Sequence, residues 1–98
     1  MLLSERSLAL HEVVHQMGFG SLDDFALEKV KETLTKEAAA SIRRIESFSE
    51  KYGIDYTEFC RHFHELQHPL YEREEDSAEW NAELKHLGIL MNQIARLD

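Results

Sequence analysis

The chain has 98 residues, 19 of them acidic and 11 basic, which gives a formal net charge of −8. This length suits a single domain with a modest core, and the negative charge argues against a general nucleic-acid binder, which needs a basic face. Cys60 is the only cysteine, so an internal disulfide is excluded and a reducing cytoplasm is indicated.

The N-terminal segment is not typical of a targeting signal. Glu5, Arg6 and Glu12 interrupt its apolar residues, which makes it a poor signal peptide. The longest aliphatic stretch, around Leu87–Met91, is far too short to span a bilayer. We therefore expect a cytoplasmic protein with no membrane partner.

Apolar residues recur at helical spacing, and no segment alternates apolar and polar residues as a half-buried strand would. We predict an all-α fold in which residues 1–98 form a single helical domain with four helices. The first helix and its turn occupy residues 1–20. Its apolar stripe consists of Leu3, Leu10, Val14 and Met17. Gly18 and Gly20 supply the turn that ends it.

The second predicted helix is unusually long and fills residues 21–53, with its helical body at about 21–52. Ser21 and Asp24 form a capping pattern, and no helix breaker follows before Gly53. Its stripe is Phe25/Ala26, Val30, Leu34, Ala38, Ile42, Ile45, Phe48 and Tyr52. About 31 helical residues span about 46 Å, whereas a compact chain of this length is roughly 34 Å across.

A helix that outgrows the globule leaves part of its stripe uncovered within the chain. We therefore expect an elongated helical hairpin or bundle that forms a homodimer. The alternative is a break in the helix at Ala38–Ser41, although small residues there also let another helix approach closely.

The third and fourth helices are predicted at residues 55–68 and 77–97. Asp55 begins the third as an N-cap followed by Glu58, and Pro69 stops it. The fourth has a seam of Trp80, Leu84, Leu87, Met91 and Ile94, spaced as in a coiled coil. The acidic run at 72–76 is interpreted as a solvated loop and helix start, or as a docking site for a basic partner.

The stretch His11-Glu12-Val13-Val14-His15 matches H-E-x-x-H, in which one helix offers two zinc ligands and a general base. A metalloprotease also needs a third ligand and a substrate cleft, and no strand-like segment is available to hold a peptide. We interpret these residues as two surface histidines that flank the apolar stripe. We accordingly expect no catalytic residues and no enzyme activity.

Cys60 and His64 lie four residues apart and would make a workable two-ligand metal clip. The alternative is a half-buried thiol beside the Phe59/Phe63 face, with exposed histidines around it. The second interpretation is simpler, so we expect no metal and no cofactor.

Two stretches carry a resemblance to a known group of proteins. "KYGIDYTEFCRHF" at 51–63, followed by "EREEDSAEWNAEL" at 72–84, resembles small all-helical, antitoxin-like or uncharacterised prokaryotic proteins. In that group a K-Y-G-[MI] turn leads to an aromatic-x-E-F helix, an acidic linker and an acidic-x-x-x-W helix start. The stretch at 18–34 also resembles the N-terminal hairpin of that group. The resemblance implies a bacterial protein that binds other proteins, and nothing in the resemblance implies catalysis.

These observations together predict a non-enzymatic, antitoxin-like interaction protein that binds and neutralises a basic partner protein encoded nearby. The predicted partner-binding residues are Tyr56, Phe59, Phe63, Glu74, Glu75, Asp76 and Trp80. For Trp80, the alternative is a core position in the last helix. One alternative function is a DNA-binding autoregulator acting through residues 1–34, and a second is a metal-binding protein. The net charge makes nucleic acid the less favoured partner.

Overall fold

The computed structural model of this chain describes residues 4–98, and within that range it contains helices but no strand. The predicted stripe residue Leu3 lies outside the described residues. The first helix, α1, runs from Glu5 to Gln16. It begins at Ser4, whose hydroxyl accepts a hydrogen bond from the backbone amide of Ser7 at 3.1 Å. The prediction for this helix is confirmed.

The long second helix, α2 (Leu22–Tyr52), is unbroken, as predicted. The Ser21 hydroxyl accepts a hydrogen bond from the backbone amide of Asp24 at 3.1 Å. Gly53 ends the helix in the left-handed conformation, with φ 71°. The alternative break at Ala38–Ser41 does not occur. Instead, Ala38 and Ser41 are buried, and the Ser41 hydroxyl donates to the backbone carbonyl of Glu83 at 3.3 Å. The small residues let the last helix pass close to α2.

The third predicted helix is shorter than residues 55–68. Asp55 is the N-cap of α3 (Tyr56–Arg61), and its carboxylate accepts a hydrogen bond from the backbone amide of Glu58 at 2.8 Å. A 3₁₀ turn, η1 (Phe63–Glu65), follows it. Arg73 explains why the chain leaves the helix here. Its guanidinium donates to the backbone carbonyls of Phe63 at 2.5 Å and His68 at 2.7 Å.

The last helix, α4 (Leu70–Leu97), begins directly after Pro69 and not at residues 76–77. The predicted start is therefore wrong, and the acidic run 72–76 forms the first turns of α4 and not a linker. Proline is favoured at helix starts because the first amides have no partner within the helix. Glu72 in the first turn also suits the positive end of the helix dipole.

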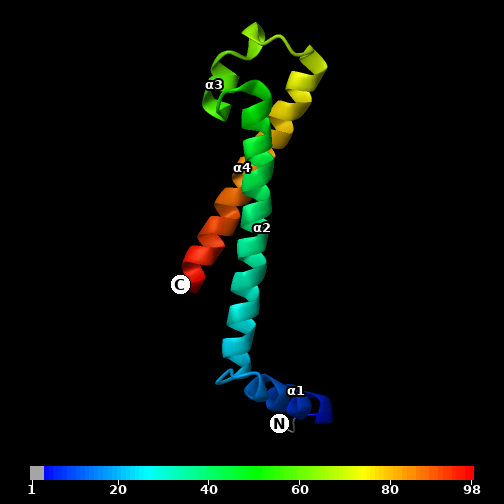
Figure 1. Cartoon of the computed structure of the whole chain (residues 1–98), viewed down its shortest axis with the longest axis vertical. Helices are drawn as coiled ribbons and strands as arrows, with labels where there is room; N and C mark the ends of the chain where they lie inside the picture. The colour runs from blue at the N-terminus through cyan, green and yellow to red at the C-terminus, as the bar shows by residue number, and fades with distance from the viewer. Residues whose placement is uncertain (1–3) are drawn as a thin grey trace.

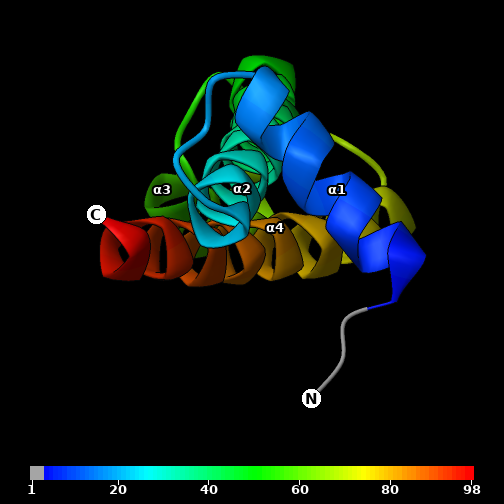
Figure 2. The same cartoon turned by 90° about the horizontal axis from the view of Figure 1, so that it is seen from below.

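In residues 4–98, the four α-helices form an elongated hairpin with one helix set across its end. Figure 1 shows α4 running back along α2 in the opposite direction and diverging from it toward the C-terminus. Viewed from below, α1 lies across the lower end of α2 (Figure 2). The molecule measures 65 × 22 × 20 Å, and its radius of gyration is 20.9 Å, against about 13 Å for a compact chain of this length.

The molecule has three regions. The head is residues 43–83: the upper part of α2, α3, η1 and the first half of α4. The lower stalk is residues 22–42 of α2 together with residues 84–98 of α4. The foot is residues 4–21.

Among the described residues, no helix combines the length and the apolar character needed to cross a membrane.

Candidate interaction surfaces

The head is built around an aromatic core. Trp80 and Phe59 are both 0% exposed, and their rings lie 5.2 Å apart. Phe48 stacks on Trp80 at 5.5 Å, and Tyr52 meets Phe59 edge-on at 4.7 Å. Trp80 is thus a core residue of the last helix, as the alternative prediction had it. Trp80 and Phe59 support the surface of the head and are not part of it.

Asp76, another predicted partner-binding residue, is only 9% exposed and lies at the edge of this core. Its carboxylate accepts hydrogen bonds from the Tyr52 hydroxyl at 2.5 Å and from the Lys51 ammonium at 2.6 Å. Lys51 also pairs with Glu72. Asp76 therefore joins the end of α2 to the first turns of α4, and its charge is largely engaged within the chain.

These contacts shift the pKa values of the three groups. Burial alone would raise the pKa of Asp76, but the hydrogen bonds from Lys51 and Tyr52 outweigh it and hold that pKa below its usual range. Burial and the adjacent carboxylate raise the pKa of the Tyr52 hydroxyl. Hydrogen bonds to Asp76 and Glu72 raise the pKa of Lys51. The cluster accordingly keeps its charges at neutral pH.

The remaining predicted site residues fall into two groups. Tyr56 and Phe63 are half-buried, and Phe63 lies beneath the Arg73 guanidinium at 5.1 Å. Glu74 and Glu75 are exposed on α4. The structure adds Tyr71, which the sequence did not single out. Its side chain is 71% exposed. Residues three and four positions apart share a helix face, so Tyr71, Glu74 and Glu75 form one exposed surface, called here the acidic face.

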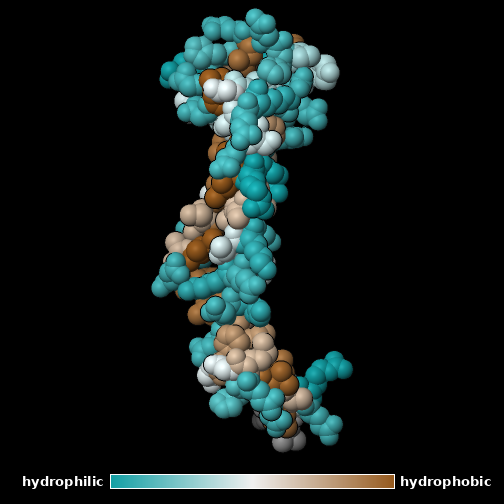
Figure 3. Space-filling model, in the orientation of Figure 1, coloured by the Kyte–Doolittle hydropathy of each residue, from teal (hydrophilic) through white to brown (hydrophobic). Residues whose placement is uncertain are grey.

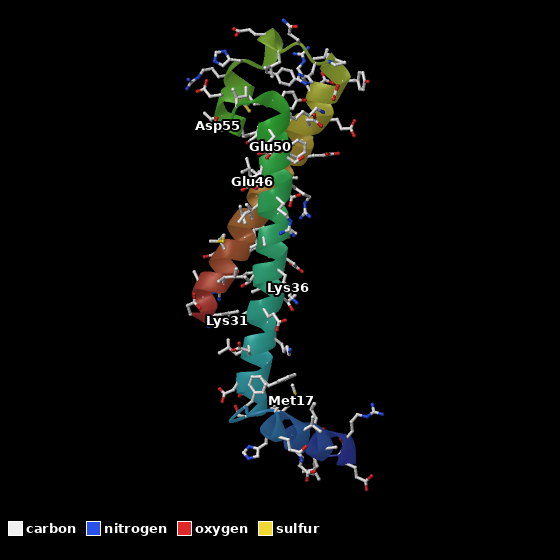
Figure 4. All side chains as sticks on the ribbon, in the orientation of Figure 1. Met17, Lys31, Lys36, Glu46, Glu50 and Asp55 are labelled. Carbon is white, nitrogen blue, oxygen red and sulfur yellow. The ribbon has the colours of Figure 1, made fainter. Side chains whose placement is uncertain are left out.

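Charge is unevenly distributed along the molecule. Between Arg43 and Glu83, eleven residues are acidic and five are basic, so the head carries −6 of the total charge of −8. The side chains labelled in Figure 4 follow this trend: Lys31 and Lys36 lie low on α2, whereas Glu46, Glu50 and Asp55 lie in the head. The head is therefore the acidic end of an elongated molecule.

Most of the exposed large apolar side chains lie on the lower stalk and the foot. On the lower stalk these are Leu27, Val30, Ile42, Ile89 and Met91; on the foot they are Leu8, Leu10, Val13 and Met17. Figure 3 shows apolar surface continuing down the stalk and onto the foot. Part of the α2 stripe is thus uncovered within the chain, as predicted. Leu27 and Ile89 were not among the predicted stripe residues.

An open groove lies between the two helices of the lower stalk, near the point where α4 ends. It has a volume of about 380 Å³ and is lined by Val30, Leu34, Gln93, Arg96 and Leu97. The level at which α4 ends is marked by Lys31, whose ammonium pairs with the Asp98 carboxylate at 3.0 Å. Below this pair α2 continues without α4 beside it (Figure 1).

The two candidate metal sites remain dispersed. His11 and His15 are exposed on α1, and within residues 4–98 no three histidine, cysteine, aspartate or glutamate side chains gather as metal ligands would. Cys60 is exposed rather than half-buried, because it points away from the core that its neighbour Phe59 fills. The expectation of a half-buried thiol is wrong.

Comparisons with protein-family models, with curated proteins and with solved structures found no match to this chain.

Proposed function

We propose that this protein is a non-enzymatic, antitoxin-like interaction module of the bacterial cytoplasm. It forms a homodimer through α2 and α4, and its acidic head binds and neutralises a basic partner protein encoded nearby. The observation that carries the proposal is the concentration of charge, because the head holds −6 of the total of −8. A surface of one sign raises the rate of encounter with a partner of the opposite sign and disfavours wrong partners.

Within the head, the acidic face is the contact surface. Tyr71 is the most exposed large apolar side chain of the described residues, and Glu74 and Glu75 stand one turn further along α4. Tyrosine is enriched among the residues that carry binding energy in interfaces, and its natural partner there is arginine or another aromatic ring. The two carboxylates fit bidentate contacts with arginine.

The buried residues named in the prediction have a supporting role. Phe59 and Trp80 fix the angle between α3 and α4, and Asp76 ties α4 to the end of α2. This arrangement holds the acidic face rigid before the partner arrives. A preformed surface lowers the entropy lost on binding.

Co-expression with the product of the adjacent gene tests the proposal. We expect the two proteins to purify together and the neighbour to be toxic when expressed alone. The double variant Glu74→Lys, Glu75→Lys should weaken the complex at least about tenfold, because it reverses two charges at the contact. The matched control Glu5→Lys, Glu12→Lys makes the same charge change on the exposed surface of the foot and should bind normally.

Added salt should weaken the complex of the unaltered protein, since exposed charges are screened. The proposal fails if the two proteins purify apart and the neighbour is harmless by itself. It also fails if the head and foot variants bind equally well.

A further inference from the structure

We infer that the lower stalk binds a second copy of the chain in antiparallel orientation, so that the two acidic heads lie at opposite ends of the dimer. This inference rests on the dimerisation that forms part of the proposed function and adds the arrangement of the subunits. It also adds a stoichiometry, because two separated heads bind two partner molecules.

Surface area is the first observation in favour of a second copy. The chain exposes 7418 Å², whereas a compact monomer of 11.5 kDa exposes about 5,800 Å². The excess is about 1,600 Å². A stable interface of standard size buries about 800 Å² on each partner, and obligate homodimers bury more. One chain therefore carries enough surplus surface to form a permanent dimer.

The position of the apolar side chains identifies the surface that is covered. Val30 and Met91 are 47% and 53% exposed, and they come from the two different helices of the lower stalk. Val30 also lines the groove in which α4 diverges from α2. A helix of a second copy would fill this groove and complete a four-helix bundle, the usual way in which paired helices bury such stripes.

Charge decides the orientation. In a parallel dimer the two heads, each of charge −6, would lie side by side. The lower stalk and the foot each carry a net charge of only −1. An antiparallel dimer places each head beside these weakly charged regions of the partner. Adjacent surfaces lie within the Debye length of about 8 Å, so this difference is not removed by physiological salt.

The shape of the subunit also favours the antiparallel dimer. The head is visibly broader than the lower stalk in Figure 3, because α3 and η1 are added there to α2 and α4. In a parallel dimer, two broad heads would meet first and hold the slender stalks apart. In an antiparallel dimer, each head lies beside the part of the partner's α2 that extends below the Lys31–Asp98 pair.

The unaltered protein offers a direct test, because Cys60 is its only cysteine and is exposed in the head. Donor and acceptor dyes on this thiol report the distance between the two heads. A second preparation, Gln16→Cys with Cys60→Ser, carries the acceptor on the foot. We expect sedimentation to show a dimer. Energy transfer should be efficient between head and foot in mixed dimers and weak between the two heads.

Substitutions in the lower stalk test the surface itself. Val30→Glu and Met91→Glu should each weaken the dimer at least about tenfold, because an unpaired carboxylate would be buried. Leu70→Glu is the matched control, since Leu70 is 50% exposed but lies in the head. Circular dichroism of each variant verifies that the helices remain folded.

Each outcome separates this inference from the proposed function. Efficient transfer between the two heads would overturn the antiparallel arrangement and leave the proposed function in place. A monomer at every concentration would overturn the inference and the dimer together, while partner binding by the head is measured independently. A dimer that forms equally well with Met91→Glu and Leu70→Glu would also contradict the inference.

Discussion

Asp76 is the buried carboxylate that connects the end of α2 to the start of α4. It lies within the acidic run that was interpreted as a solvated loop and helix start, yet its carboxylate is buried and joins Lys51 and Tyr52 of α2 to α4. Two hydrogen bonds to one carboxylate offset the cost of taking it out of water. Composition could not have identified this role, because the neighbouring Glu74 and Glu75 have the same charge and are exposed.

Asp76→Asn should lower the free energy of unfolding at pH 7 by about 1–3 kcal/mol, since it weakens hydrogen bonds to a charged group. The pKa of Asp76 is lowered in the folded state. Its contribution is therefore present above its unfolded pKa, near 3.9, and is lost as the pH falls through the lower, folded value. The difference between the two proteins should be largest at neutral pH and shrink in acid.

Urea unfolding measured at pH 7 and in acid tests this prediction. Trp80 is the only tryptophan and is fully buried, so its fluorescence reports the unfolding of the head. Glu75→Gln is the control, because the exposed carboxylate should contribute less than about 0.5 kcal/mol. An equal effect of Asp76→Asn at both pH values would contradict the role assigned to the charge.

At the scale of the helices, the sequence predicts most of the fold. Ser21 and Asp55 are capping residues that act over three positions, and local rules of this kind gave both helix starts correctly. The start of α4 was missed because Pro69 was interpreted only as the end of a helix. The end of α3 was missed because the Arg73 contact with the Phe63 carbonyl joins residues ten positions apart.

The candidate surfaces were predicted less completely than the helices. Spacing identified Phe59 and Trp80 as apolar helix positions, but it did not decide whether a partner or the core covers them. That depends on where α3 packs against α4, which is a tertiary property. Tyr71 was missed for a related reason: its exposure follows from the position of the α4 start.

Two glycines on different elements should respond oppositely to the same substitution. Gly53→Ala forces a side chain into the left-handed conformation that ends α2, and we expect a loss of about 1 kcal/mol. Gly88→Ala, within α4, should gain up to about 1 kcal/mol from helix propensity. An added Cβ meets no atom within 4 Å at either position, so both effects come from the backbone alone. Thermal unfolding of the two variants would contradict this interpretation if both changes had the same sign.

At the scale of the whole molecule, the shape makes stability depend on association. A chain 65 Å long and about 20 Å thick leaves much of its apolar surface in water. If a second copy covers the lower stalk, the midpoint of thermal unfolding should rise with protein concentration, because association favours the folded state by mass action. Met91→Glu should remove most of this dependence, while Leu70→Glu retains it. A midpoint that is independent of concentration in the unaltered protein would contradict the prediction.

The hairpin also has a consequence for the order in which the chain folds. Tyr52 and Asp76 are 24 residues apart in sequence, whereas Lys31 and Asp98, at the other end of the α2–α4 pair, are nearly three times further apart. Closing the shorter loop costs about 0.9 kcal/mol less in chain entropy. We therefore expect the aromatic core to form early, and α4 then to pair with α2 progressively toward the C-terminus. The acidic head would be complete before the lower stalk closes, and a chain emerging in its native order would complete its dimer surface last, when α4 packs beside α2.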